Sequence, residues 1–197
     1  REELERRLLA AERSERGLFR TFLRLYAATI GRPVMGEKTP THLGHVDTLL
    51  EWFPRARVVH MQRDPRAIYV SDRYRRKTKG RRPYSWIAKI PLLLEAWLLV
   101  MTIFSWRRAM KLHERLAARY PSSYMLLKFE DVVRSPEPTL ARLSEFLGVE
   151  VEVEPEAVRV AKGHGMRSAE EGIDAAAADR WRERLHPVAK RILDLCL

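Results

Sequence analysis

Short apolar runs alternate with longer amphipathic segments through the middle of the chain, which is the pattern of strands joined by helices. Residues 34–38, 58–61 and 124–128 are the three runs, and each predicts a short strand, the second of them buried. A helical segment ending near Trp52 separates the first two runs, and further helical segments separate the second from the third. Strand–helix–strand order of this kind indicates a parallel sheet.

Helical spacing accounts for most of the remaining chain. Arg1–Ile30 repeats apolar residues at helical intervals and predicts one or two amphipathic helices broken near Gly17, with a coiled-coil interaction helix as the alternative. Pro136 and Gly148 bracket another helix as its first residue and its C-cap. From Trp181 onward the sequence predicts a short helix followed by an amphipathic one.

Residues 90–106 form the most apolar stretch of the chain. The stretch is short for a membrane span and is interrupted by Glu95. Helical spacing predicts a long helix to about Arg119. Its buried face is expected to carry Leu93, Trp97, Val100, Met101 and Phe104. Basic residues on both sides leave a second interpretation open, an interfacial helix that touches lipid or a lipid-linked acceptor.

The turn after the second strand carries the first candidate chemistry. Arg63 lies at the carboxyl end of this strand, Asp64 suits the N-cap of the next helix, and Pro65 suits its first position. Ser71 follows about two turns into that helix. A guanidinium and a hydroxyl near a helix N-terminus make a phosphate site. The alternative is a plain strand–turn–helix with a solvated arginine.

Two further candidates come from the other strand ends. Ligands of parallel sheets bind beyond the carboxyl ends of the strands. Lys38 ends the first strand, so Lys38 and Arg63 are expected to converge. Phe129 follows the third strand, where its ring could stack on a base. A solvated loop lysine and an ordinary core phenylalanine are the alternatives for these two residues.

The net charge of +11 adds the expectation of an anionic partner. Arginine outnumbers lysine, which favours bidentate recognition of phosphate. The charge is scattered and no helix-turn-helix or zinc-finger spacing appears, so nucleic acid is disfavoured. With 32% charged and 46% hydrophobic residues, the 197-residue chain is expected to form one globular domain with a sizeable core.

The cysteine and histidine content argues against internal disulfides and metal sites. Cys196 is the only cysteine, which rules out an internal disulfide and a multi-cysteine metal site and fits a cytoplasmic protein. The six histidines lack metal-ligand spacing, so no metal is expected. Residues 162–179 contain Gly-His-Gly and an alanine run and predict a mobile lid. That lid bears Lys162, His164, Arg167 and Ser168.

An ordered set of three segments resembles the sulfotransferases that use 3′-phosphoadenosine 5′-phosphosulfate. The segments are GEKTPTHLGHVDTLLEWFPRARVV, RDPRAIYVSDRY and FEDVVRSPEPTLARLSEFLG. The ending RWRERLHP is similar to the late tryptophan-containing segment of that family, so the resemblance covers about residues 34–187. It is greatest to the bacterial, tyrosylprotein and glycan-modifying branches.

The resemblance implies a fold and roles for the candidate residues. The fold would be P-loop-NTPase-like, a helix-rich three-layer α/β/α domain with a short parallel sheet. Arg63 and Ser71 match the residues that bind the 3′-phosphate, and Lys38 matches a lysine at the sulfuryl group or its bridging oxygen. Phe129 falls where the family has an aromatic residue beside the adenine.

The late-segment assignments follow the family pattern less closely. Arg167 and Ser168 correspond to late-segment cofactor contacts, but their spacing to Trp181 differs from the family pattern. The family's phosphosulfate-binding loop, first strand and first helix are absent and would precede residue 1, together with the usual catalytic carboxylate or histidine. We therefore expect an incomplete domain that is inactive without the upstream loop. Glu37, His42 and His45 are local candidates for a base, and none is assigned.

The implied reaction moves a sulfuryl group from the nucleotide to a hydroxyl or amine of an acceptor and leaves adenosine 3′,5′-bisphosphate, without a metal. A glycan, peptide, lipid or natural product all fit as acceptor, and peripheral membrane contact is compatible with the basic and apolar segments. One rival is a P-loop kinase that needs ATP and Mg²⁺. The other is a basic helical module that binds nucleic acid or membrane without catalysis, with affinity that falls steeply with salt.

Overall fold

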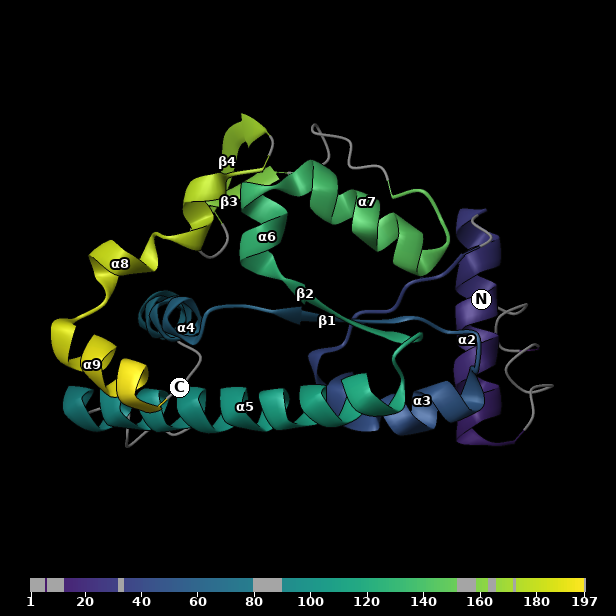
Figure 1. Ribbon diagram of the computed structural model, residues 1–197, viewed down its shortest axis with the longest axis horizontal. Coiled ribbons are helices and arrows are strands. Elements are labelled where there is room, and N and C mark those ends of the chain that lie inside the picture. The colour runs from purple at the N-terminus through teal and green to yellow at the C-terminus, as the bar shows by residue number, and fades with distance from the viewer. Residues whose placement is uncertain are drawn as a thin grey trace. The chain divides into compact units, whose positions relative to one another are not determined.

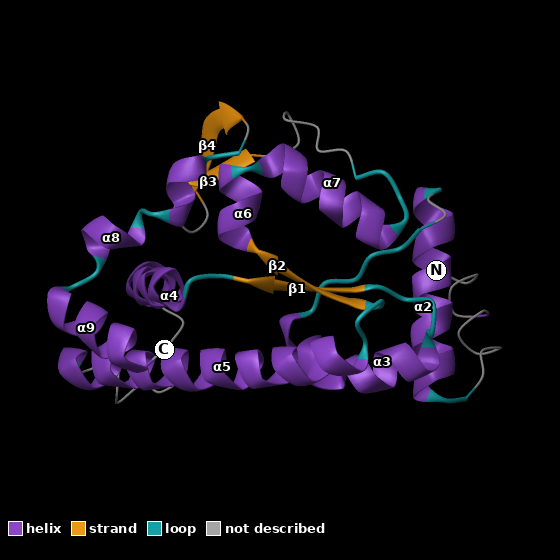
Figure 2. Cartoon of the chain, in the orientation of Figure 1, coloured by secondary structure: helices purple, strands orange, loops and turns teal. Residues whose placement is uncertain are grey.

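The computed structural model describes residues 6, 13–31, 34–79, 90–151, 159–162, 166–171 and 173–196. Contacts divide the chain into two compact units, Arg1–Ala56 and Arg57–Leu197. Helices make up most of the described chain, as the sequence predicts (Figures 1 and 2). That the two units act as one sulfotransferase-like domain stays a prediction.

The first unit contains a helix with a cap at each end, α2 (Glu15–Ile30). Its N-cap is Ser14, whose Oγ accepts a hydrogen bond from the backbone N–H of Gly17 at 3.0 Å. The helix ends at Gly31, whose φ of 64° is a left-handed conformation that favours glycine. The break that the sequence places near Gly17 therefore lies at Ser14, and Gly17 is part of the first turn.

The rest of the first unit is η1 (Pro40–His45) followed by α3 (Val46–Trp52). This confirms a helical segment ending at Trp52, although its first part is a 3-10 helix. The strand predicted over 34–38 is wrong, because these residues form no strand in the described chain. A strand needs a neighbouring ladder of backbone hydrogen bonds. This loop is instead fixed by side chains, with Glu37 bound to Thr39 and His42.

The second unit is built around two parallel strands, β1 (Val58–Gln62) and β2 (Tyr124–Lys128). Their register runs from Val58 opposite Tyr124 to Gln62 opposite Lys128. Both strands and their parallel pairing agree with the sequence prediction. The expected burial of β1 is only partial, since Met61 is 51% exposed.

Helices follow each strand of this unit. α4 (Pro65–Lys79) and the long α5 (Pro91–Arg119) come after β1. After β2 come α6 (Phe129–Arg134), α7 (Pro136–Leu147), η4 (Ala175–Ala178), α8 (Trp181–Arg184) and α9 (Pro187–Cys196). Pro136 opens α7 and Gly148 caps it with a φ of 69°, as expected. The short helix and the amphipathic helix predicted after Trp181 are α8 and α9.

An antiparallel pair of strands, β3 (Arg159–Lys162) and β4 (Met166–Glu171), lies between α7 and η4. The predicted lid over 162–179 therefore contains the last residue of β3, all of β4 and η4. Residues 163–165, with the Gly-His-Gly sequence, lie outside the described residues, and lid motion stays a prediction.

The core of the second unit forms where α4, α5, α8 and α9 meet. Its buried members are Ala67, Tyr69, Leu98, Trp181, Leu185, Ala189 and Leu193. In Figure 1 α5 runs alongside α9 and past the end of α4. Within the described residues no helix combines the length and hydropathy that crossing a bilayer requires.

The predicted length of α5 is right, and Trp97 packs against the core as predicted, but the other four residues of the predicted buried face are exposed. Val100 and Phe104 are exposed, whereas the buried positions of the helix are Leu98, Thr102 and Leu116. A polar anchor explains part of this orientation. The carboxylate of Glu95 accepts hydrogen bonds from the Tyr69 hydroxyl and from Nε of Arg73, both at 2.5 Å. Burial and the neighbouring carboxylate raise the pKa of the Tyr69 hydroxyl, so it donates. The side of α5 that carries Glu95 must therefore face α4.

Two histidines and a tyrosine form a polar cluster between the strands and α5. The Tyr124 hydroxyl lies 2.7 Å from Nδ1 of His60 and 3.3 Å from Nδ1 of His113. Tyr124 is buried, and burial raises its pKa to about 12. Burial also lowers the pKa of His60 below its ordinary 6.5, and a positive charge on His113 lowers it further.

We expect the protein to lose stability as the pH falls below about 6.5, the ordinary pKa of histidine. A folded-state pKa that lies below the unfolded value means that the folded state binds fewer protons. The stabilisation is therefore complete above pH 6.5 and is lost as the pH falls through the folded pKa. Thermal unfolding of the protein and of His60→Gln between pH 7 and pH 5 measures this, with the exposed His45→Gln as control. An unchanged pH dependence in His60→Gln would contradict it.

Candidate functional site

The parallel register brings together two residues that are far apart in the sequence. Gln62 and Lys128 are opposite each other at the ends of β1 and β2, so Arg63 and Phe129 leave the sheet at the same edge. The Arg63 guanidinium carbon lies 4.5 Å from the centroid of the Phe129 ring. This is a cation–π contact between two of the residues predicted to form the site.

Arg63 is half-buried and retains an unused donor. Its Nη2 donates to the carbonyl oxygen of Ala177 at 3.4 Å, whereas its Nε is buried and has no hydrogen-bond partner among the described residues. Buried donors of this kind normally have a partner. Burial lowers the pKa of Arg63, the Glu130 carboxylate opposes that shift, and the charge of Arg180 adds to it. A guanidinium is still cationic at neutral pH, so an anion is the natural partner of this Nε–H.

The turn after Arg63 has the capping geometry that the sequence predicts. Oδ1 of Asp64 accepts from the backbone N–H of Arg66 at 2.8 Å, with Pro65 as the first residue of α4. The side chain of Arg66 also binds the Asp64 carboxylate, with Nη2 to Oδ2 at 2.7 Å, and its guanidinium lies 4.4 Å from the Trp181 ring centroid. The start of α4 is thus attached to α8.

Glu130 joins the two strand ends. Its Oε1 accepts a hydrogen bond from the backbone N–H of Asp64 at 2.9 Å. Glu130, which follows Phe129, therefore binds Asp64, which follows Arg63, and the two chain segments cannot separate without losing this hydrogen bond. The sequence indicated no role for Glu130, whose only signal was its position two residues after a predicted strand end.

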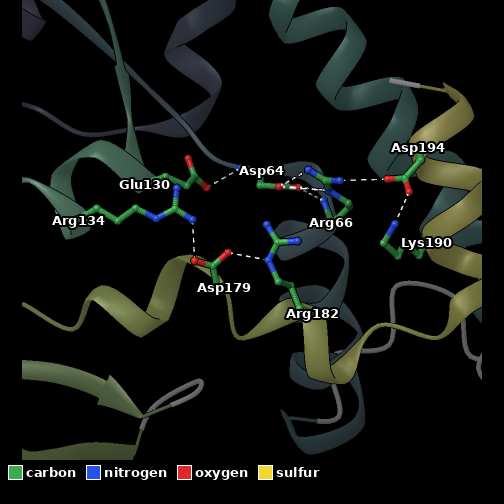
Figure 3. A network of polar contacts seen from close by, with 8 residues as sticks. All are labelled: Asp64, Arg66, Glu130, Arg134, Asp179, Arg182, Lys190 and Asp194. Atoms are coloured by element: carbon green, nitrogen blue, oxygen red, sulfur yellow. Dashed lines mark hydrogen bonds and ion pairs between the residues drawn. The ribbon is translucent and has the colours of Figure 1, made fainter.

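Acidic and basic side chains alternate around this edge (Figure 3). Asp179 binds Arg134 at 2.6 Å and Arg182 at 2.8 Å, and these two hydrogen bonds lower the pKa of its carboxyl group. Arg66 reaches Asp194 on α9 at 3.0 Å. Arg180 binds Asp174. The Asp179–Arg134 pair connects the segment 174–182 to α6, and this segment supplies the Ala177 carbonyl to Arg63.

Ser71 and Lys38, two other predicted residues, lie in different parts of the chain. Ser71 is partly buried in α4 and interacts within the protein. Lys38 is exposed in the first unit, in a loop where Glu37 and His42 form an ion pair at 2.6 Å. Arg63 belongs to the second unit. The convergence of Lys38 with Arg63 therefore stays a prediction, as does the 3′-phosphate role of Ser71.

The late candidates are placed by backbone alone. Arg167 and Ser168 belong to β4, and Arg167 is opposite Ala161 in the register. Their side chains lie outside the described residues, so their cofactor contacts stay predictions. Among the described residues, no group of three or more His, Cys, Asp or Glu side chains is placed to hold a metal ion.

The sequence matches a family model described as the sulfotransferase family over residues 2–153. Among curated proteins it is similar to the omega-hydroxy-beta-dihydromenaquinone-9 sulfotransferases Stf3 of Mycobacterium bovis and Mycobacterium tuberculosis, with 31% identity over 135 residues. The match covers 68% of this chain and 33% of each relative. The chain thus spans about a third of the length of the curated relatives it matches.

Two solved structures are similar in fold. One is the sulfotransferase domain from the Synechococcus PCC 7002 olefin synthase, with a TM-score of 0.56, 19% identity, and coverage of 98% of this chain and 74% of that one. The other is the sulfotransferase domain from the curacin biosynthetic pathway, with a TM-score of 0.53, 19% identity, and coverage of 88% and 66%. At this identity they establish the fold, so the predicted P-loop-like fold with a short parallel sheet is confirmed.

We expect Glu130→Ala to destabilise the protein by about 1–2 kcal/mol, because a partly buried backbone N–H loses its acceptor. Glu130→Gln keeps an oxygen acceptor and should lose less. Urea unfolding measures both variants, with Glu137→Ala, an exposed glutamate at the start of α7, as the matched control. Equal effects of Glu130→Ala and Glu137→Ala would show that the bond to Asp64 contributes nothing.

Proposed function

The chain belongs to the sulfotransferase family, and on that basis we propose that it transfers a sulfuryl group from 3′-phosphoadenosine 5′-phosphosulfate to a hydroxyl of an acceptor. Family membership implies a sulfonate-donor nucleotide and an acceptor. The choice of this particular donor, with its phosphate at the 3′ position, is our proposal. It is supported most directly by the buried, unpartnered Nε–H of Arg63.

In this proposal Arg63 binds the 3′-phosphate. Its Nε–H has no acceptor among the described residues, and the neighbouring N-terminus of α4 favours negative charge. Ser71 would add its hydroxyl, and Arg167 and Ser168 would contact the same nucleotide from β4. Because the Arg63 guanidinium lies over one face of Phe129, the adenine would meet the opposite face or the edge of that ring.

Lys38 would act at the other end of the nucleotide. The reaction breaks the bond between sulfur and the bridging oxygen of the phosphate and forms a bond between sulfur and the acceptor oxygen. The acceptor proton leaves to a base, and adenosine 3′,5′-bisphosphate is released. An ammonium group beside the bridging oxygen stabilises the charge that develops there, which lowers the barrier. Lys38 and Arg63 belong to different compact units, so their meeting at one nucleotide is part of the proposal.

The acceptor is proposed to be an apolar molecule that carries a hydroxyl group. The mycobacterial relatives are named for a hydroxylated dihydromenaquinone. The present chain also exposes apolar side chains along α5. These two observations favour an apolar acceptor over a glycan or a peptide.

Adenosine 3′,5′-bisphosphate should raise the melting temperature of the protein more than ADP, which has no 3′-phosphate. At a ligand concentration about a hundred times the dissociation constant, the expected shift is about 5–10 °C. Arg63→Ala should abolish the difference between the two nucleotides, whereas the exposed Arg142→Ala should keep it. Equal shifts by both nucleotides, or a full shift in Arg63→Ala, would remove the proposed 3′-phosphate site.

Lys38→Met should lower the transfer rate on the order of 10²–10³-fold while leaving the affinity for adenosine 3′,5′-bisphosphate nearly unchanged, because the lysine acts on the developing charge. The measurement uses radiolabelled donor with a hydroxylated menaquinol as acceptor, and the exposed Arg24→Met as control. A variant that transfers at the native rate would exclude Lys38 from the reaction.

A further inference from the structure

Most of the apolar face of α5 that the sequence predicts to be buried is exposed, with Trp97 as the residue that packs against the core. Leu93 is 45% exposed, Val100 58% and Phe104 59%. Their spacings of seven and four residues place them on one side of the helix. The opposite side is the one that packs against the core, through Leu98 and Thr102. The helix therefore presents a continuous apolar stripe that no described residue covers.

Basic residues continue this stripe toward the C-terminal end of α5. Arg107 and Lys111 lie on the same side of the helix as Phe104, and Arg108 flanks them. All three are exposed, and none forms an ion pair with another described residue. Between residues 105 and 119 the only acidic residue is Glu114. We call these six residues, Leu93, Val100, Phe104, Arg107, Arg108 and Lys111, the α5 surface.

We propose that the α5 surface binds an anionic lipid membrane. The apolar part extends about 17 Å along the helix, from Leu93 to Phe104, and the basic part follows it directly. A membrane surface offers acyl chains and anionic headgroups at neighbouring depths, so it matches both parts at once. A hollow of about 1020 Å³ lies along α5 from Val100 to Arg115, and its described lining includes five of the six residues of the α5 surface.

A second copy of the chain matches this surface poorly. If two α5 helices paired in parallel, the basic parts would oppose each other, and if they paired antiparallel along their full length, the apolar part of each would meet the basic part of the other. Nucleic acid also matches poorly, because a phosphate backbone binds basic residues but does not bury an exposed stripe of Leu, Val and Phe. Charge complementarity together with the apolar stripe favours lipid.

This inference concerns binding and goes beyond the proposed reaction. Only one consequence rests on the proposed function, namely that membrane binding would bring the protein to an apolar acceptor dissolved in the same bilayer. Lipid binding and nucleotide binding are measured separately, so either can fail without the other.

The test is co-sedimentation of the purified protein with vesicles of phosphatidylcholine mixed with phosphatidylglycerol, compared with vesicles of phosphatidylcholine alone. We expect binding to the anionic vesicles, weakened by salt. Arg107→Gln combined with Lys111→Gln should lower the affinity by about 25-fold, since each basic residue near an anionic surface contributes about fivefold. Val100→Ser combined with Phe104→Ser should lower the affinity for the anionic vesicles by about tenfold or more.

Matched controls come from other exposed positions of the second unit. Arg142→Gln with Arg191→Gln removes two exposed basic residues from α7 and α9, and Val188→Ser removes an exposed apolar residue from α9. These variants should bind as the native protein does, apart from a small general loss of charge. Circular dichroism and the nucleotide-induced melting shift verify that each variant is folded.

Four results would overturn the inference. The first is no binding of the native protein to the anionic vesicles while the shift with adenosine 3′,5′-bisphosphate persists. The second is equal loss in the α5 variants and in the controls, which would mean that net charge alone drives binding. The third is competition by short duplex DNA that is equally strong for the native protein and for Val100→Ser with Phe104→Ser. The fourth is a dimer of the native protein in sedimentation velocity that dissociates in the same double variant. Loss of the nucleotide shift with lipid binding retained would instead remove the proposed function alone.

Discussion

The parallel pairing of β1 with β2 is the constraint on which the candidate site depends. Parallel strands in register end at the same edge, so the residues that follow them leave the sheet as neighbours. Arg63 and Phe129 are those residues, and Asp64 and Glu130 come next and hold each other by a backbone hydrogen bond. An antiparallel pair would have placed the same residues at opposite ends. One register therefore assembles an arginine, an aromatic ring and a helix N-terminus from segments 66 residues apart.

Arg63 keeps a hydrogen-bond donor without a partner among the described residues, although the arginines around it are paired. Arg66, Arg134 and Arg182 are each paired with an aspartate (Figure 3). Arg63 has the Ala177 carbonyl and the Phe129 ring instead of a bound carboxylate, and its Nε is buried without a described partner. Leaving a buried donor unused costs stability, of the order of 1–3 kcal/mol, unless a ligand supplies the acceptor. This distinguishes Arg63 from the structural arginines around it.

The orientation of α5 gives the second unit two different surfaces on one helix. Glu95 must face α4, because the Tyr69 hydroxyl and Arg73 are its partners there, and Leu98 and Thr102 follow it into the core. With that side fixed, Val100 and Phe104 point away from the core. The exposed stripe is thus a consequence of packing the polar anchor inward, and it places apolar and basic side chains together on a face available to a partner.

Much of the local structure was predictable from the sequence, because it depends on residues that are neighbours in the chain. The strands at 58–62 and 124–128, the Asp64 cap, the Pro65 and Pro136 helix starts and the Gly148 C-cap all follow from local backbone preferences. The family motifs lie on these same segments, which is why the family and the fold were predictable. The sequence also indicated Arg63 and Phe129 as site residues, since each follows a strand.

Other features depended on contacts between distant segments. The run at 34–38 has strand composition but no ladder partner among the described residues, so it is a loop fixed by Glu37 and His42. Helical periodicity showed that α5 has two sides, but both carry apolar residues, and only tertiary contacts, those of Glu95 among them, decided which side is buried. The hydrogen bond from Asp64 to Glu130 likewise could not be predicted without knowing that the two strands are neighbours. Sequence fixes local conformation because its causes are local, whereas the free donor of Arg63 and the exposed face of α5 are properties of tertiary packing.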